Sequence, residues 1–185
     1  MKCIVLLIVL MVTMGSCSRE DELEARAMRV RELVCTKSVT FTARVRSTVE
    51  GTGESFTLDC EADCGGDVRF SVVQPECISG IQGSLSGTGG KLLFDTHAVA
   101  FSMLANGRAS PISAPWLLMK TLRAGYIHAW GVEKDLLRLT IMDSYHEDAL
   151  QMDIWFTDEN VPVQSEVIWR NTRILTMEID QFRFL

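Results

Sequence analysis

Val-Thr-Phe-Thr-Ala-Arg-Val-Arg at residues 39–46 alternates apolar and polar side chains without a break. The sequence Phe-Thr-Leu-Asp-Cys-Glu-Ala-Asp at residues 56–63 repeats this alternation. Successive side chains of a β-strand point to opposite faces, so the pattern predicts two strands with one face buried and one in solvent. Residues 50–54, Glu-Gly-Thr-Gly-Glu, fit a loop between the two strands.

The turn after the second strand can be placed by its register. The following strand has its apolar face at the even-numbered positions of residues 68–72. A two-residue turn at 65–66 would set Cys60 opposite a polar side chain, whereas a three-residue loop at 64–66 sets Cys60 opposite Phe70. The three-residue loop is therefore the expected connection.

Similar signals continue along the chain and predict a long antiparallel meander of eight to ten strands. Pro75 is expected to end the third strand, because proline donates no ladder hydrogen bond. The further strand candidates are a glycine-rich hairpin at 78–87 and 91–94, then 98–103, 137–141, 152–156, 163–169 and 174–184. With two helices added, the fold class is mainly β (α+β).

The two helices are expected near the N-terminus and in mid-chain. Residues 18–34 carry an apolar stripe at helical spacing. Pro115 and Gly125 bracket a short helix at 116–124. This helix is too apolar to face water all round, so we expect it on the concave side of the sheet. There it would pack in the core or act as a lid over an apolar cavity, with lining side chains Trp116, Leu118, Met119 and Leu122.

The chain begins with the pattern of an export signal. Lys2 precedes an apolar run at residues 3–14, and Gly15-Ser16-Cys17 follows. The run is shorter than the roughly 20 residues needed to span a bilayer. Met14-Gly15-Ser16-Cys17 resembles the bacterial lipobox, in which the cysteine receives diacylglycerol and becomes the mature N-terminus. Cys17 is the expected lipid attachment site; an ordinary cleaved signal or an uncleaved anchor are the alternatives.

Cleavage before Cys17 would divide the chain into a signal peptide, 1–16, and a single lipid-anchored domain, 17–185. Lys2 is the only charged residue removed, so the net charge moves from −6 to −7. An acidic domain offers no electrostatic basis for nucleic-acid binding. It also has no general attraction to anionic lipid, so attachment to the membrane would depend on the acyl chains.

Four cysteines remain beyond Cys17, namely Cys35, Cys60, Cys64 and Cys77. In an exported protein they are candidate disulfide members, with three pairings open. The spacing of Cys60 and Cys64 has no second ligand cluster behind it, and the three histidines share no spacing with the cysteines, so no metal site is expected. Buried free thiols or one disulfide are the favoured outcomes.

No catalytic set is visible in the sequence. The one cluster with catalytic side chains, residues 146–148 (His-Glu-Asp), lies between two predicted strands and fits a polar turn. Phosphate-binding loops, dinucleotide fingerprints and the H-E-x-x-H motif are missing from the sequence. We therefore expect no enzymatic activity, no catalytic residues and no cofactor.

The order of these parts resembles the LolA/LolB-type half-barrel, and most closely the spore germination lipoproteins of Gram-positive bacteria (GerS-like). The matching stretches are 70–80, 92–95, 110–116 and 161–168. The resemblance implies a curved antiparallel sheet, a half-barrel with an N-terminal helix and a short mid-chain helix on its concave side. It also implies attachment to the extracytoplasmic face of the cell membrane.

Two functions follow from the resemblance. The first is a non-catalytic scaffold at the outer face of the membrane, which binds a protein partner in sporulation or germination, such as a cortex peptidoglycan amidase. The second is a lipoprotein carrier or acceptor that binds acyl chains in an apolar cavity. A second copy of the chain, forming a homodimer, is a further candidate partner.

Overall fold

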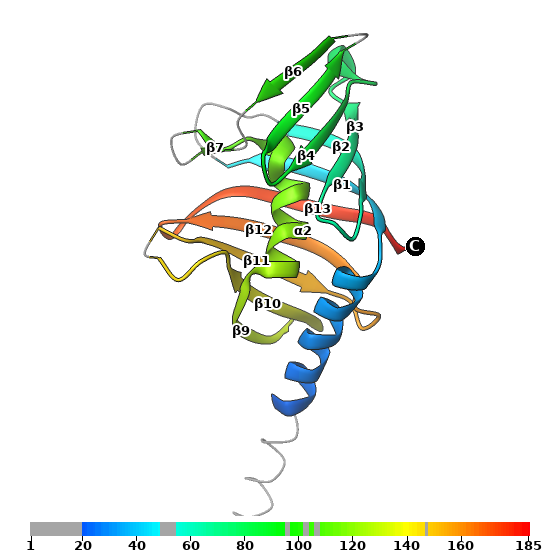
Figure 1. Ribbon diagram of the computed structural model, residues 1–185. Coiled ribbons are helices and arrows are strands. Elements are labelled where there is room, and N and C mark those ends of the chain that lie inside the picture. Colours follow the sequence, from blue (N-terminus) through cyan, green and yellow to red (C-terminus); the bar gives the residue numbers. More distant parts are fainter. Residues whose placement is uncertain (1–19, 49–54, 95–96, 102–103, 106–107, 147) are drawn as a thin grey trace, which may run out of the picture.

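The computed structural model describes residues 20–48, 55–94, 97–101, 104–105, 108–146 and 148–185. The predicted signal peptide and Cys17 lie outside these residues. The described part begins with a helix at residues 20–36 and continues into a long antiparallel sheet (Figure 1). Its strands are β1 (Val39–Ser47), β2 (Ser55–Ala62), β3 (Val68–Gln74), β4 (Gln82–Ser86), β5 (Gly89–Phe94), β6 (His97–Phe101), β9 (Tyr126–Glu133), β10 (Leu136–Met142), β11 (Leu150–Phe156), β12 (Pro162–Trp169) and β13 (Thr172–Phe184).

Within the described residues this sheet has eleven strands, in the order β6-β5-β4-β3-β2-β1-β13-β12-β11-β10-β9. Two meanders, β1–β6 and β9–β13, meet where β1 pairs with β13. The connection between the meanders contains a short hairpin, β7 (Leu104–Ala105) and β8 (Arg108–Ala109), and the helix α2 (Ala114–Ala124). In Figure 1, α2 runs across one face of the sheet from the first meander to the second. The expected fold class is confirmed.

The register of the first hairpin is confirmed residue by residue. Cys60 lies opposite Phe70, as a loop at 64–66 requires. The turn closes with a hydrogen bond from the Asp63 N–H to the Asp67 carbonyl (3.1 Å), and Gly66 takes a φ of +99°. A positive φ at this position is easily adopted by glycine.

Two local predictions were wrong. Residues 78–81 do not extend the glycine-rich hairpin, because a 3₁₀ turn, η1 (Glu76–Ile78), follows Pro75 and Gly80 has a φ of +85°. Strand β9 was not expected at all. Its side chains are mostly exposed or half-buried because it forms one edge of the sheet, so its sequence lacks a regular alternation.

One face of the sheet, with the two helices on it, forms the core. The helix at 20–36 buries Ala27, Val30 and Val34, each 1% exposed, whereas Met28 is 49% exposed. Buried side chains from α2 and from β1, β2, β3, β4, β10, β11, β12 and β13 belong to the same cluster.

The two helices are fastened to each other at their C-terminal ends. Arg31 donates from Nε to the Leu122 carbonyl (3.1 Å) and from Nη2 to the Gly125 carbonyl (2.5 Å). Arg123 donates in return from Nε to the Val34 carbonyl (2.8 Å). Carbonyls in the last turn of a helix have no intrahelical partner, so each arginine satisfies part of the other helix.

Candidate binding surfaces

The four predicted cavity or lid residues lie together on α2 and belong to the core. Trp116 is 7% exposed, Leu118 and Met119 are 0% exposed and Leu122 is 1% exposed. The Nζ of Lys120 lies 5.2 Å from the centroid of the Trp116 ring. The apolar side chains of α2 therefore pack within the molecule, and their role as a lid stays a prediction.

The four described cysteines are thiols in different surroundings. Cys60 is buried on the core face of β2, and burial, with a smaller contribution from the charge of Asp59, raises the pKa of its thiol far above the ordinary value. Cys35, Cys64 and Cys77 are exposed. Cys60 is thus an unreactive core side chain, whereas the other three can meet reagents in solvent.

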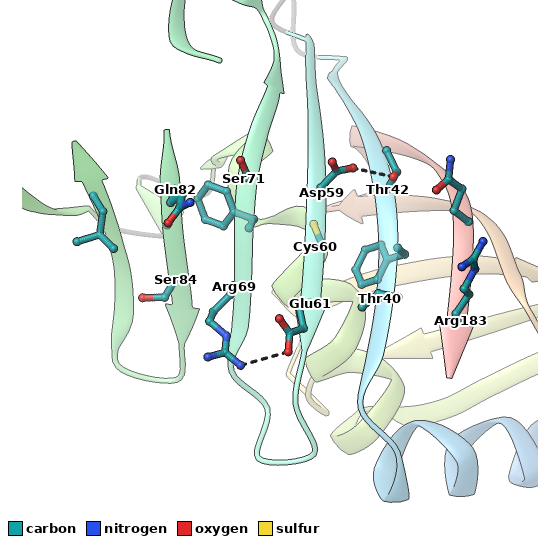
Figure 2. Close-up of a pocket in the computed structure, with 15 residues that line it drawn as sticks. Thr40, Thr42, Asp59, Cys60, Glu61, Arg69, Ser71, Gln82, Ser84 and Arg183 are labelled. Carbon is teal, nitrogen blue, oxygen red and sulfur yellow. Dashed lines mark hydrogen bonds and ion pairs between the residues drawn. The ribbon is translucent and has the colours of Figure 1, made fainter. Parts of the chain in front are cut away.

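The opposite face of the sheet, which points away from α2, carries a polar depression that we call the outer groove. Figure 2 shows its side chains on neighbouring strands. Its volume is about 630 Å³. Register places its side chains in two cross-strand rows. One row is Arg183, Thr40, Glu61, Arg69 and Ser84, and the other is Thr42, Asp59, Ser71, Gln82 and Leu93.

A bulge in β13 shapes one end of the outer groove. Thr40 pairs with Arg183, but Thr42 pairs with Asp180, so β13 has one extra residue there. Gln181 has a φ of +52°, and the ring of Phe182 stacks on Phe41 in the core at a centroid distance of 5.6 Å. The bulge therefore keeps Phe182 buried and brings both Gln181 and Arg183 to the outer groove.

Both signs of charge are present in the outer groove. Thr42 Oγ1 donates to Asp59 Oδ1 (2.8 Å), and Arg69 Nη2 lies 3.3 Å from Glu61 Oε1. Figure 2 marks both contacts. Arg183 has no ion pair within the described part of the chain. Hydroxyls, amides and partly free charges in a shallow depression suit hydrogen bonding to an extended polar segment.

A second depression of about 340 Å³ lies beside the edge strand β9. Two of its lining residues, Arg138 and Thr140, bond to Asp153 on β11, which is only 2% exposed. Asp153 accepts hydrogen bonds from Arg138 Nη2 (2.5 Å), Thr140 Oγ1 (2.7 Å) and Gln151 Nε2 (3.2 Å). Arg138 also approaches Glu133, and both carboxylates raise the pKa of Arg138, chiefly through the hydrogen bond to Asp153. These bonds satisfy the buried carboxylate, and the network ties β9, β10 and β11 together.

Sequence reasoning missed the outer groove because it depends on the register of six strands and on the bulge. The alternating polar residues of β1 and β2 indicated a polar face of the sheet, but they gave no sign that this face is hollowed.

Among the described residues no group of three or more His, Cys, Asp and Glu side chains is placed to hold a metal ion. In the same part of the chain, no helix combines the length and apolar character needed to cross a bilayer.

No protein-family profile and no curated protein matches this chain. Solved structures do resemble it. An uncharacterized conserved protein from Thermus thermophilus is 8% identical with a TM-score of 0.50, covering 88% of this chain and 87% of that chain. A LolA superfamily protein from Nitrosomonas europaea is 7% identical with a TM-score of 0.42, and the match covers 86% of this chain and 93% of that chain. The Mycobacterium tuberculosis lipoprotein LppX is 11% identical with a TM-score of 0.43, covering 88% and 95%. At these identities the similarity concerns the fold alone.

Proposed function

We propose that this chain is a non-catalytic lipoprotein, attached through Cys17 to the extracytoplasmic face of the cell membrane, which binds a protein partner on the outer groove. The observation that carries the proposal is the packing of α2. Its side chains on the core face of the sheet are 0–7% exposed, so the face that would hold acyl chains in a carrier is occupied by the protein itself. The outer groove remains free for a partner.

The character of the outer groove favours a protein segment as its occupant. Residues Arg69 and Arg183 can meet carboxylates, while Asp59, Ser71 and Gln82 can bond main-chain or side-chain amides. Leu93, 49% exposed, offers one apolar contact at the edge. This mixture resembles the polar rim of protein–protein interfaces, where charge pairs set orientation and partner choice.

The position of the anchor fits a scaffold that presents this groove. Only Ser18 and Arg19 separate Cys17 from the helix that is described from residue 20, and the three peptide steps span at most roughly 10 Å. The N-terminal end of this helix projects past the β9–β13 part of the sheet, whereas β3–β6 lie at the other end (Figure 1). A short tether at residue 17 would therefore hold the outer groove away from the lipid surface.

The finer assignment to sporulation or germination, with a cortex amidase as partner, depends on the sequence resemblance alone, which the stretches 70–80, 92–95, 110–116 and 161–168 carry. The carrier function remains the alternative. Native mass spectrometry of the delipidated domain separates the two: a lipid-free protein supports the scaffold, and stoichiometric co-purifying lipid supports the carrier.

Site-specific photocrosslinking in cells tests the outer groove. We expect a crosslinker at Ser84, in the groove, to capture one partner, and a crosslinker at Gln164, on the same face of β12 but outside the groove, to capture none. Arg183→Glu should abolish the Ser84 product. The matched change Arg46→Glu reverses an exposed arginine on the same face outside the groove and should leave the product unchanged. Equal capture at both positions would contradict the proposal.

A further inference from the structure

Cys35 and Cys64 belong to distant parts of the sequence but lie at the same corner of the fold. Cys35 is in the last turn of the helix at 20–36, and Cys64 is in the turn between β2 and β3. Val39 pairs with Ala62, and extending this register outward by two residues places Lys37 opposite Cys64. In agreement, the Cys64 sulfur lies 3.4 Å from the Thr36 carbonyl oxygen. Cys64 therefore contacts the residue that directly follows Cys35.

Arg123 gives independent evidence for this proximity. The Cys35 sulfur lies 4.0 Å from the Arg123 carbonyl oxygen, and Arg123 Nε donates to the neighbouring Val34 carbonyl. On the other side, a Cβ atom placed on Gly66 would lie 3.9 Å from Arg123 Nη1. The same side chain thus spans from the helix that carries Cys35 to the turn that carries Cys64. Both thiols are exposed, so they are accessible and free to change rotamer.

The other described cysteines cannot replace either member of this pair. Cys60 points into the core and is 5% exposed. Cys77 lies in η1, beyond the opposite end of β3 from Cys64. Seven residues of strand span roughly 23 Å, whereas the Cα atoms of a disulfide lie within about 7 Å of each other.

We infer that Cys35 and Cys64 form a disulfide that fastens the N-terminal helix to the β2–β3 turn. Both thiols lose a proton, one S–S bond forms, and two electrons pass to the disulfide of an extracytoplasmic thiol oxidant, which leaves as two thiols. The inference depends on the export proposed above, because disulfides persist in oxidising compartments. A crosslink at this place ties the element next to the lipid anchor directly to the sheet.

The bond should raise the thermal stability of the protein. It closes a loop over residues 36–63 and so restricts the unfolded chain. Adding dithiothreitol to the full-length protein should lower Tm by roughly 5–15 °C, given typical disulfide contributions and the Tm response of a chain this size. Cys35→Ser and Cys64→Ser should each show the lower Tm and no further response to reductant. Cys77→Ser should behave as the wild type.

Peptide mapping gives the direct test. The full chain is expressed with its own leader, quenched in acid, alkylated, extracted from membranes and digested without reductant. A Cys35–Cys64 linked peptide, with alkylated Cys60 and Cys77, supports the inference. Alkyl groups on both Cys35 and Cys64 in membrane-anchored protein would overturn the pairing and leave the proposed function intact.

A control separates the pairing from export. If the chain is found uncleaved in the cytosol, export fails, and the purified chain is then equilibrated with oxidised and reduced glutathione. If Cys35 and Cys64 form a disulfide whose reduction potential is equal to or lower than that of thioredoxin, the result supports the proposed pairing independently of export. Mixed glutathione adducts on separate cysteines would overturn it.

Discussion

The guanidinium of Arg31 caps α2, and the guanidinium of Arg123 caps the helix that carries Arg31. This exchange is the polar connection between the two helices that cover the core. Each arginine is half-buried, and each bonds carbonyls that lack an intrahelical partner. The relative placement of the helices therefore depends on three charge-assisted hydrogen bonds as well as on apolar packing.

Arg31→Ala should lower the free energy of unfolding by about 2 kcal/mol, since hydrogen bonds to charged groups contribute roughly 1.5–3 kcal/mol. Arg123→Ala should have a similar effect. Urea denaturation measures both, and Arg29→Ala, an exposed arginine on the same helix, is the control with little effect. Equal midpoints for Arg29→Ala and Arg31→Ala would contradict the capping role.

Gly83→Ala should destabilise the protein by about 1–3 kcal/mol through overpacking. The new Cβ would lie 2.3 Å from Phe70 Cζ and 2.9 Å from the Lys91 carbonyl oxygen. Gly131→Ala is the matched control, because among the described residues only its two chain neighbours come within 4 Å of its Cβ position. Chemical denaturation should show a loss for Gly83→Ala alone, and Phe70→Leu should recover part of that loss when combined with it.

Asp153→Ala should cost about 1–3 kcal/mol, because the Arg138, Thr140 and Gln151 donors lose their shared acceptor. The loss is limited because Arg138 is 40% exposed and keeps its contact with Glu133. Asp153→Asn keeps the shape and one acceptor, so its cost should be smaller. Calorimetry of the two variants shows which of them loses more stability. A larger loss for the asparagine variant would contradict this account, because asparagine keeps an acceptor for Thr140 and Gln151 that alanine lacks.

The pKa of the Asp148 carboxyl should lie below its ordinary value. The hydrogen bond from Arg170 Nε (2.7 Å) is the main cause, and the arginine charge adds to it. A lowered folded pKa stabilises the fold above the ordinary carboxyl range, and this contribution is lost as pH falls through the folded pKa. NMR titration of the Asp148 carboxyl carbon should show a higher pKa in the Arg170→Gln variant than in the wild type. High salt should reduce this difference in pKa between the two proteins.

Cys17→Ala should leave a precursor that is not labelled by radioactive palmitate, because the thiol that accepts diacylglycerol is gone. The folded domain should be unaffected, with the same Tm when purified. Fractionation and labelling in cells check this. Normal cleavage and continued membrane attachment of the variant would show that residues 14–17 are not a lipobox.

Much of the fold could be predicted because a strand with one buried face has a sequence in which apolar and polar residues alternate. The alternation in residues 39–46 and 56–63 set the register of Cys60 against Phe70, since a one-residue slip would turn every apolar side chain to solvent. Pro115 and Gly125 likewise marked the ends of α2. In each case a local rule and the tertiary structure favour the same conformation.

The remainder could not be predicted because it depends on contacts between distant segments. In the described part of the chain, strand β9 pairs with β10 alone. Trp130 and Val132 on this edge strand remain 37% and 46% exposed, and the alternation is lost. The outer groove forms only because β13 pairs with β1. No local sequence pattern predicts that pairing or the bulge at Gln181. The sequence also does not predict that Arg31 and Arg123 cap each other's helices, since arginine is common on exposed helix faces.

The pairing of β1 with β13 also governs when the protein can fold. Arg44 and Asp180, which form an ion pair across these strands, are 136 positions apart. The centre of the sheet is therefore assembled from opposite ends of the described chain, and such non-local pairing makes folding slow. A chain emerging N-terminus first from a secretion channel would stay open until residue 184 had crossed. If the chain is exported as proposed, slow closure would keep the polypeptide unfolded, and so able to pass through a narrow pore, for the whole passage.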